Sequence, residues 1–262
     1  MPLLTLTSDL GTSDPYVAGI KGRVISRCPD LRIVDITHEV KPFEPKSAAF
    51  FLRQVWKDFP DDTIHWIGLD AQRTSKPRNL IVFHHNQYFI GADDGLFALL
   101  FDQHPEFIFA IREGIGKEYN DEGIFSDMLL AATWLASGKE LLDIATQQRE
   151  IQSSVPLTAV ETEDAIRAVV IHIDRFGNVI LNVTRDAFER VGKFRTFELK
   201  FRRMERITRM SDAYSDVPIG ERLCRFNEAG YLEIAMNQGN AAGLLGLDID
   251  TAVQILFQSE EK

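Results

Sequence analysis

Residues 3–15 read LLTLTSDLGTSDP, and this stretch decides the fold. The apolar run at residues 3–7 predicts a buried β-strand, and Asp9 follows it in a short loop. Asp14 and Pro15 then predict an N-cap and the first position of a helix, whose buried face is formed by apolar residues between 17 and 25. A strand, a short loop and a helix in this order are typical of an α/β protein.

The same alternation of strands and helices continues to about residue 138. Further strands are expected at residues 31–36, 63–69 and 107–111, a hairpin at 80–90 that turns at His85 and Asn86, and helices from Glu44 and Pro45 and over 128–135. Such alternation predicts a mainly parallel sheet covered by helices. We therefore expect an α/β domain over residues 1–150.

The pattern changes after Gly138. Residues 139–156 are polar and end in SSVP, which predicts a linker. From Ala165 onward the apolar runs are short and separated by turn residues. These runs predict a second, β-rich domain over residues 151–262, closed as a small β-barrel or a sandwich.

The composition is that of a soluble protein with a marked negative charge. The 262 residues carry a formal net charge of -10, which argues against nucleic acid as a partner. One basic stretch, residues 200–209, alternates with apolar residues, and we interpret it as the solvated face of a strand. Cys28 and Cys224 lie far apart, so we expect neither a disulfide framework nor a metal site. We also expect no export signal and no membrane segment, which favours the cytoplasm.

Three acids, Asp9, Asp70 and Asp174, each come after an apolar run that predicts a strand. Ligands of α/β folds gather at the carboxyl ends of strands, so these acids are candidates for a site that binds a small, polar, cationic ligand. Asp9 is suited to accept the hydroxyls of a ribose, but it is equally explained, like Asp14, as a local cap. Asp70 is explained equally well as a turn acid and as a catalytic acid.

Two further residues near these strand ends have both a structural and a functional interpretation. We interpret His38 as a hydrogen-bonded structural histidine rather than a base. Phe43 lies in a loop that begins with Lys41 and Pro42. It is either a core or staple residue or an aromatic that stacks on a flat base.

A set of short motifs in a fixed order resembles one enzyme family. The motifs are residues 4–12 (LTLTSDLGT), 33–38 (IVDITH) with Pro42 and Phe43, 92–96 (ADDGL), 173–178 (IDRFGN), 230–235 (GYLEIA), Asn237 and 239–242 (GNAA). Together they are similar to the S-adenosylmethionine hydroxide adenosyltransferase family, the relatives of the fluorinases and chlorinases. The resemblance implies an N-terminal α/β domain, a C-terminal β-barrel and a homotrimer, with the ligand between one subunit's large domain and a neighbour's small one.

The resemblance also implies the chemistry. S-adenosylmethionine is the substrate and no cofactor is required; water or hydroxide attacks the 5′ carbon, methionine leaves as a neutral thioether, and adenosine forms. Because the sulfonium leaves without a proton, the protein has to orient and desolvate the nucleophile. By resemblance, Asp9 holds the ribose diol, Asp14 supports that loop and Phe43 packs near the sugar or the adenine.

The C-terminal domain is implied to supply the remaining substrate contacts. By resemblance, Asp174 takes the methionine ammonium, and Phe176 and Asn178 shape the adenine and amino-acid contacts. Acidic residues also suit a cationic substrate.

The chain departs from the family pattern in the residues that handle water. Asp70 is kept, but Pro77 stands where the family has an arginine, so only Arg78 or Arg73 is near enough to serve. Residues 123–127 replace a segment in which the family has a histidine, and Ser126 supplies a small hydroxyl near that place.

Three functions are compatible with this combination of kept and replaced family residues. The favoured one is hydrolysis of S-adenosylmethionine, with Asp70 and Arg78 as the catalytic residues. The second is a protein that binds S-adenosylmethionine or adenosine without catalysis. The third and weakest is a halogenase that uses Ser126.

Overall fold

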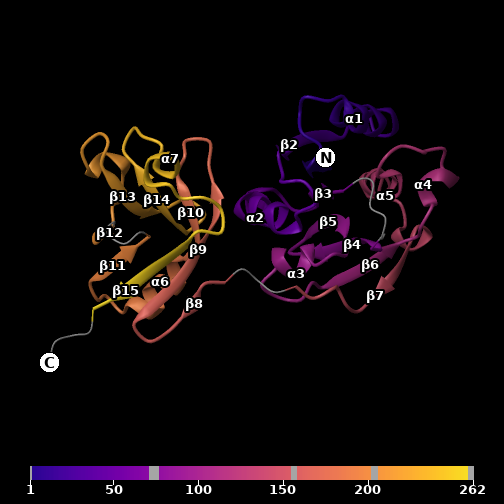
Figure 1. The fold of residues 1–262 in the computed structure, drawn as a ribbon. Coiled ribbons are helices and arrows are strands. Elements are labelled where there is room, and N and C mark those ends of the chain that lie inside the picture. The colour runs from indigo at the N-terminus through magenta and orange to yellow at the C-terminus, as the bar shows by residue number, and fades with distance from the viewer. Residues whose placement is uncertain (1, 71–76, 155–157, 202–205, 259–262) are drawn as a thin grey trace. The chain divides into compact units, whose positions relative to one another are not determined.

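A computed structural model of the protein describes residues 2–70, 77–154, 158–201 and 206–258. The strand predicted at residues 3–7 is β1 (Leu3–Ser8), which lies inside a seven-stranded sheet of the order β2-β1-β3-β5-β4-β6-β7 (Figure 1). Four strands run in parallel: β2 (Arg32–Thr37), β1, β3 (Ile64–Gly68) and β5 (Gln87–Ala92). The antiparallel strands β4 (Asn79–His84), β6 (Phe107–Ile111) and β7 (Ala145–Gln148) complete the sheet.

Helices cover both faces of this sheet. Neighbouring side chains of a strand point to opposite faces, so on β3 Trp66 packs with α1 (Tyr16–Arg27) and α5 (Ser126–Ala136), whereas Ile67 packs with α2 (Pro45–Val55) and α3 (Leu96–Leu100). The short helix α4 (Ile115–Glu118) and the 3₁₀ turns Trp56–Asp58 and Leu141–Asp143 lie in the connections. The predicted α/β class is confirmed.

Local signals in the sequence place two of the element ends correctly. The β4–β5 hairpin turns at His85 and Asn86, whose φ angles are 48° and 60°, as the type I′ turn of a tight hairpin requires. Helix α2 begins with Pro45 at its first position, after Glu44. Both predictions are confirmed.

The start of α1 differs from the prediction. Pro15 itself occupies the N-cap position, its carbonyl accepts the N–H of Gly19, and no side chain caps the helix. Asp14 stands one residue too early to cap, and it is exposed on the loop. The interpretation of Asp14 as a helix cap is therefore wrong.

The segment predicted as a linker contains an additional strand. Residues 145–148 form β7, which pairs with β6 at the edge of the sheet. An edge strand has one unpaired side exposed to water, so its sequence ATQQ carries no apolar run that marks a strand. The linker prediction is wrong for this part.

The chain forms two compact units, residues 1–156 and residues 157–262. The domain boundary that we expect between residues 150 and 151 remains a prediction.

The second unit is an antiparallel sheet of the order β12-β11-β15-β9-β10-β14-β13, with β8 paired to β9 (Figure 1). Its strands are β8 (Val160–Glu161), β9 (Ala165–Ile173), β10 (Val179–Thr184), β11 (Phe197–Lys200), β12 (Arg206–Ile207), β13 (Arg222–Phe226), β14 (Tyr231–Met236) and β15 (Ala252–Phe257). The interior of this unit is filled by a hydrophobic core that includes Val179, Leu199, Leu232 and Ile255.

The two edge strands of this sheet approach each other. Just beyond β12, Met210 bridges to Cys224 on β13, and the N–H of Ser211 donates to the Cys224 carbonyl at 2.9 Å. The side chain of Arg222 donates to the Arg206 carbonyl at 3.3 Å. The sheet is therefore nearly closed, and the predicted β-barrel is confirmed.

The barrel also carries two short helices that the sequence interpretation missed. They are α6 (Arg185–Gly192) and α7 (Ala241–Leu245). Thr184 and Asn240 cap them by accepting backbone N–H groups from Ala187 and Gly243. A 3₁₀ turn, Tyr214–Asp216, precedes β13.

The basic stretch at residues 200–209 is only partly described. Lys200 and Arg206 both form ion pairs with Glu198 on the barrel surface, which agrees with a solvated strand face. Arg202 and Arg203 lie outside the described residues. Among the helices of the described residues, none has the length and apolar character that crossing a membrane requires.

Candidate functional site

The carboxyl ends of β1, β2 and β3 are joined by one carboxylate. Asp9 Oδ2 accepts the backbone N–H of Phe43 at 3.1 Å and that of Asp70 at 3.0 Å. Because these residues follow three neighbouring parallel strands, the loops of all three strands are held together by Asp9. The structure thus brings together Asp9 and Asp70, two of the three acids that follow predicted strands, and adds Phe43 to them. The third acid, Asp174, lies in the second unit.

Phe43 and Asp70 have unusual backbone conformations. Their φ angles are 65° and 50°, in the left-handed region that costs a side chain other than glycine free energy. The Phe43 ring is 70% exposed, so the alternative that it is a core residue is wrong.

His38 stabilises the same strand ends from within. Its Nδ1 lies 2.7 Å from Ser8 Oγ, its Nε2 lies 3.1 Å from Asp35 Oδ1, and its carbonyl accepts the N–H of Gly11 at 2.7 Å. The His38 side chain is buried. These contacts agree with its interpretation as a structural histidine.

A pocket of about 440 Å³ opens beside this cluster, at the ends of β3, β5 and β6 and the start of α5. Its polar lining includes Asp70, Arg78, Asp94 and Ser126, and Ile67, Leu69 and Phe125 belong to its apolar lining. The residues predicted to handle the nucleophile therefore share one pocket.

Arg78 uses its guanidinium to bind other parts of the protein. Its Nε donates to Asp93 Oδ2 at 2.8 Å, and its two terminal nitrogens donate to Gln148 Oε1 at 3.0 Å and the Glu150 carbonyl at 2.7 Å. Asp93 in turn accepts the N–H of Gln152 at 2.7 Å. Arg78 thus anchors the segment after β7 to the pocket wall. Arg73 lies outside the described residues.

Ser126 is the first residue of α5 and packs closely on the connection before it. A Cβ on Gly116 would come within 2.6 Å of the Ser126 side chain, so this approach requires glycine. Asp127 accepts the N–H groups of Gly114 and Gly116 at 2.9 and 2.8 Å. These contacts fix the start of α5 at the pocket.

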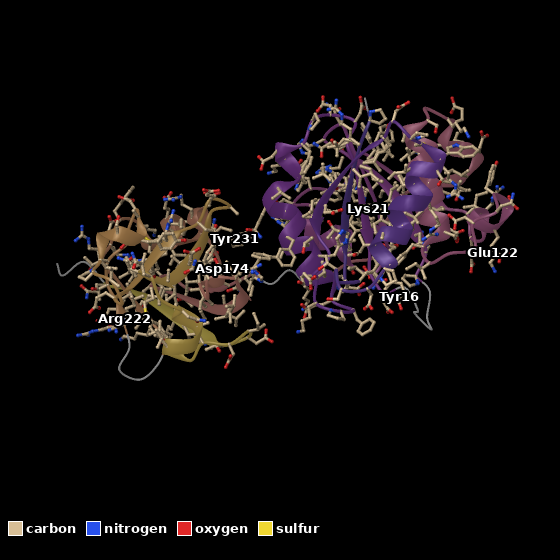
Figure 2. The ribbon with its side chains drawn as sticks, turned by 90° about the horizontal axis from the view of Figure 1, so that it is seen from above. Tyr16, Lys21, Glu122, Asp174, Arg222 and Tyr231 are labelled. Atoms are coloured by element: carbon tan, nitrogen blue, oxygen red, sulfur yellow. The ribbon has the colours of Figure 1, made fainter. Side chains whose placement is uncertain are left out.

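The second unit holds the other predicted residues, in the loop between β9 and β10. Figure 2 shows Asp174 in this unit. Asp174 Oδ1 accepts the N–H groups of Phe176 and Asn178 at 2.9 and 2.8 Å, and Oδ2 accepts the Asn178 amide at 2.9 Å. A carboxylate has about four acceptor positions. Three of these positions are used within the described residues. The Phe176 ring is 77% exposed, whereas Asn178 is buried.

Sequence reasoning missed a polar network behind this loop. Tyr214 donates its hydroxyl to Glu233 Oε1 at 2.8 Å and lies 3.5 Å from the Asn178 amide nitrogen, and the Arg225 guanidinium lies 4.8 Å from its ring centre. Glu233 is 3% exposed, and this burial raises the pKa of its carboxyl group. The signal was a glutamate inside the apolar run Tyr231–Met236.

Comparison with known proteins identifies the family. The model of the SAM hydroxide adenosyltransferase N-terminal domain matches residues 4–145, and that of the C-terminal domain matches residues 168–254. The chain belongs to the SAM hydroxide adenosyltransferase family. The resemblance inferred from the motifs is confirmed.

Three relatives of this family member are distant in sequence but match it along almost its whole length. An (R)-S-adenosyl-L-methionine hydrolase from Methanocaldococcus jannaschii is 27% identical over 98% of this chain and 97% of that protein. A fluorinase from Actinopolyspora mzabensis is 22% identical over 92% of each chain. An uncharacterized conserved protein from Thermotoga maritima has a crystal structure with a TM-score of 0.84, 25% identity and coverage of 98% of this chain and 100% of that chain.

Proposed function

We propose that this protein hydrolyses S-adenosylmethionine to adenosine and methionine by attack of water or hydroxide on the 5′ carbon. The observation that carries the proposal is the bond from the Asp70 backbone to the Asp9 carboxylate. It places a candidate ribose-binding acid directly beside a candidate water-orienting acid at one edge of the sheet. The (R)-S-adenosyl-L-methionine hydrolase named among the relatives supports the same reaction.

Each acid has a separate task in this proposal. Asp9 accepts the ribose hydroxyls, Asp14 supports the Asp9 loop, and Phe43 covers the sugar or the adenine. Asp70 orients the water in the pocket, and the methionine sulfur leaves as a neutral thioether that needs no proton. The contribution of the protein is therefore to position the water in line with the leaving group and to exclude other water.

Arg78 and Ser126 form the pocket around that water. Since the Arg78 guanidinium already donates to Asp93, Gln148 and the Glu150 carbonyl, we propose that it fixes the wall and adds positive charge beside the nucleophile. We further propose that Asp174 binds the methionine ammonium through its remaining acceptor position, with Phe176 and Asn178 beside it. The complete site would then combine the two units in a homotrimer, and the enzyme would act in the cytoplasm without a cofactor.

A second candidate function is binding without turnover. The bonds of Arg78 to the protein itself favour it, because they use three of the five N–H donors of the guanidinium and fix its orientation without a ligand. A halogenase is the third candidate, because Ser126 lines the pocket at the start of α5.

One experiment separates the three functions. Purified protein is incubated with S-adenosylmethionine in water that is enriched in the heavy oxygen isotope and contains added fluoride or chloride. The products are then analysed by chromatography and mass spectrometry. We expect methionine and adenosine that carries the heavy oxygen at its 5′ hydroxyl. A 5′-halogenated nucleoside would indicate a halogenase, and stoichiometric binding without products would contradict hydrolysis.

A further inference from the structure

The pocket wall formed by residues 122–127 is held from behind by an arginine of α1. Arg23 donates from one terminal nitrogen to the Ile124 carbonyl at 2.8 Å and from the other to Asp121 Oδ1 at 2.7 Å. Ile124 and its neighbours line the pocket, while Arg23 lies behind them. Helix α1, which carries Arg23, packs beside α5. Glu122, a residue of the pocket wall, is labelled in Figure 2.

Asp121 is the buried partner that keeps Arg23 in place. It is 3% exposed, and its second oxygen accepts from Arg27 at 2.7 Å, while Oδ1 also accepts the N–H of Gly123 at 3.1 Å. Burial alone raises the pKa of Asp121, but the hydrogen bonds from the two arginines outweigh burial and lower it. The charged carboxylate therefore holds both the arginine and the backbone of the wall.

The wall requires this support because its backbone is tightly packed and strained. A Cβ added to Gly123 would lie 2.3 Å from an Arg23 terminal nitrogen, so the guanidinium rests directly on the backbone. Phe125, two residues later, has a φ angle of 56°. A residue in that conformation persists only where its surroundings determine it.

We propose that Arg23, together with Asp121, is a positioning residue that fixes residues 122–127 and so the wall facing the nucleophile. This inference rests on the proposed function in one respect: it takes the pocket to be the place where water attacks. A displacement of about 1 Å in such a wall is enough to slow a reaction on the order of 100-fold while leaving distant contacts unchanged. Arg23 does not touch the substrate in this proposal.

The test compares Arg23→Gln with Arg27→Gln. Both substitutions remove one arginine from Asp121, but only Arg23 also holds the Ile124 carbonyl. We measure hydrogen exchange of the backbone at residues 121–127, adenosine binding by calorimetry, and kcat and KM per adenosine-binding site. In Arg23→Gln we expect exchange at least about tenfold faster and a kcat about 10- to 100-fold lower, with adenosine affinity within about threefold. In Arg27→Gln we expect markedly smaller changes.

Gly123→Ala disturbs the contact between Arg23 and the wall by changing the wall instead of the arginine. The added methyl group has to displace the Arg23 guanidinium, so this variant should reproduce the loss of kcat seen in Arg23→Gln. In the double variant the two losses should not add, because both remove one contact. Additive losses would contradict the proposal.

The remaining outcomes also test the proposal that Arg23 holds the wall. Unchanged exchange in Arg23→Gln would overturn the proposal whether or not the protein turns over S-adenosylmethionine, and so would faster exchange with unchanged kcat. Equal effects of Arg23→Gln and Arg27→Gln would show that only the charge of Asp121 matters, which also overturns it. If the unmodified protein forms no adenosine, hydrolysis fails as the function, and the exchange data alone decide whether Arg23 holds the wall.

Discussion

A single oxygen atom of Asp9 accepts two backbone N–H groups from two different loops. These two hydrogen bonds fix the orientation of the carboxylate, and they therefore also fix the position of its other oxygen. The Asp174 carboxylate is held in the same manner by the loop that contains it. In both places the backbone fixes a charged group, which would lower the entropic cost of binding the ligand that we propose.

These two acids should differ in which ligands they recognise. Asp9→Asn should weaken adenosine and S-adenosylmethionine alike, by about 10- to 100-fold, because both ligands carry the ribose diol and the variant loses charge-assisted hydrogen bonds. Asp174→Asn should weaken S-adenosylmethionine by a similar factor but adenosine by less than about threefold, because adenosine has no ammonium group. Titration calorimetry with the two ligands measures both. Equal losses for the two ligands in Asp174→Asn would refute its assignment.

Asp70 should be the residue on which turnover depends most. Asn tolerates the left-handed conformation of Asp70 better than Ala does, so Asp70→Asn tests the charge and Asp70→Ala tests the whole side chain. Both should lower kcat by roughly 100-fold or more, with adenosine affinity nearly unchanged, as product formation and calorimetry report. Any turnover by the unmodified protein should be slow, because the family's histidine is missing. Full activity in Asp70→Ala would require a different mechanism.

At the level of elements, a buried histidine joins three strands of the sheet in the first unit. His65 on β3 lies 2.7 Å from Thr5 Oγ1 on β1 and 2.7 Å from Gln87 Oε1 on β5. Burial, the larger effect, lowers the pKa of His65 from 6.5 to about 4, and the hydrogen bond to Gln87 opposes it. The folded protein therefore keeps this ring neutral where an unfolded chain would protonate it.

The stability of the first unit should fall in acid for this reason. Between about pH 6.5 and about pH 4 the unfolded state binds more protons at this site, so the free energy of unfolding decreases as pH falls, by about 2 kcal/mol between pH 7 and pH 5. Urea unfolding at the two pH values measures the change. In His65→Gln this contribution should disappear, although the variant is less stable at pH 7. An identical pH dependence in both proteins would contradict the lowered pKa.

How far the elements follow from the sequence depends on how local their signals are. The turn at His85 and Asn86 and the start of α2 at Pro45 were predictable because turn geometry and proline act within a few residues. Strand β7 was not, because an edge strand needs no apolar pattern, and the helix after Thr184 was hidden in a region of short strands.

The candidate site shows the same limit. The strand ends predicted a common site for Asp9, Asp70 and Asp174. Asp9 and Asp70 do meet, because parallel strands end at one edge, whereas Asp174 follows a strand of the antiparallel sheet in the second unit. That Arg78 is bound by Asp93 and Gln148 was not predictable, since these partners lie 15 and 70 residues further along the chain.

For the whole molecule, the predicted binding residues fall into two groups, one in each compact unit. Asp9 belongs to the first unit and Asp174 to the second. In the homotrimer that we propose, each site takes its first group from one subunit and its second from a neighbour. A closed ring of three identical subunits has three such sites.

Subunit complementation tests this arrangement. Asp9→Asn and Asp174→Asn chains, each with little turnover at a low concentration of S-adenosylmethionine when purified alone, are expressed together with different affinity tags, and mixed oligomers are isolated. In an isolated mixed trimer, one of the three sites should contain both intact groups, so about a third of the sites should regain turnover. If each site is built within one chain, every site carries one substitution and no activity returns. Light scattering of the unmodified protein checks the trimer itself.

The way in which Asp9 holds Phe43 also bears on how this protein can diversify. Asp9 binds the backbone of position 43 and not its ring, so the identity of that exposed side chain contributes nothing to the bond. Substitutions at this position are therefore decoupled from folding, apart from the preference of its left-handed backbone for residues such as glycine and asparagine. A randomised library at position 43 should yield mostly folded proteins that differ in which nucleoside analogues they accept, which makes this loop a natural starting point for altering substrate preference.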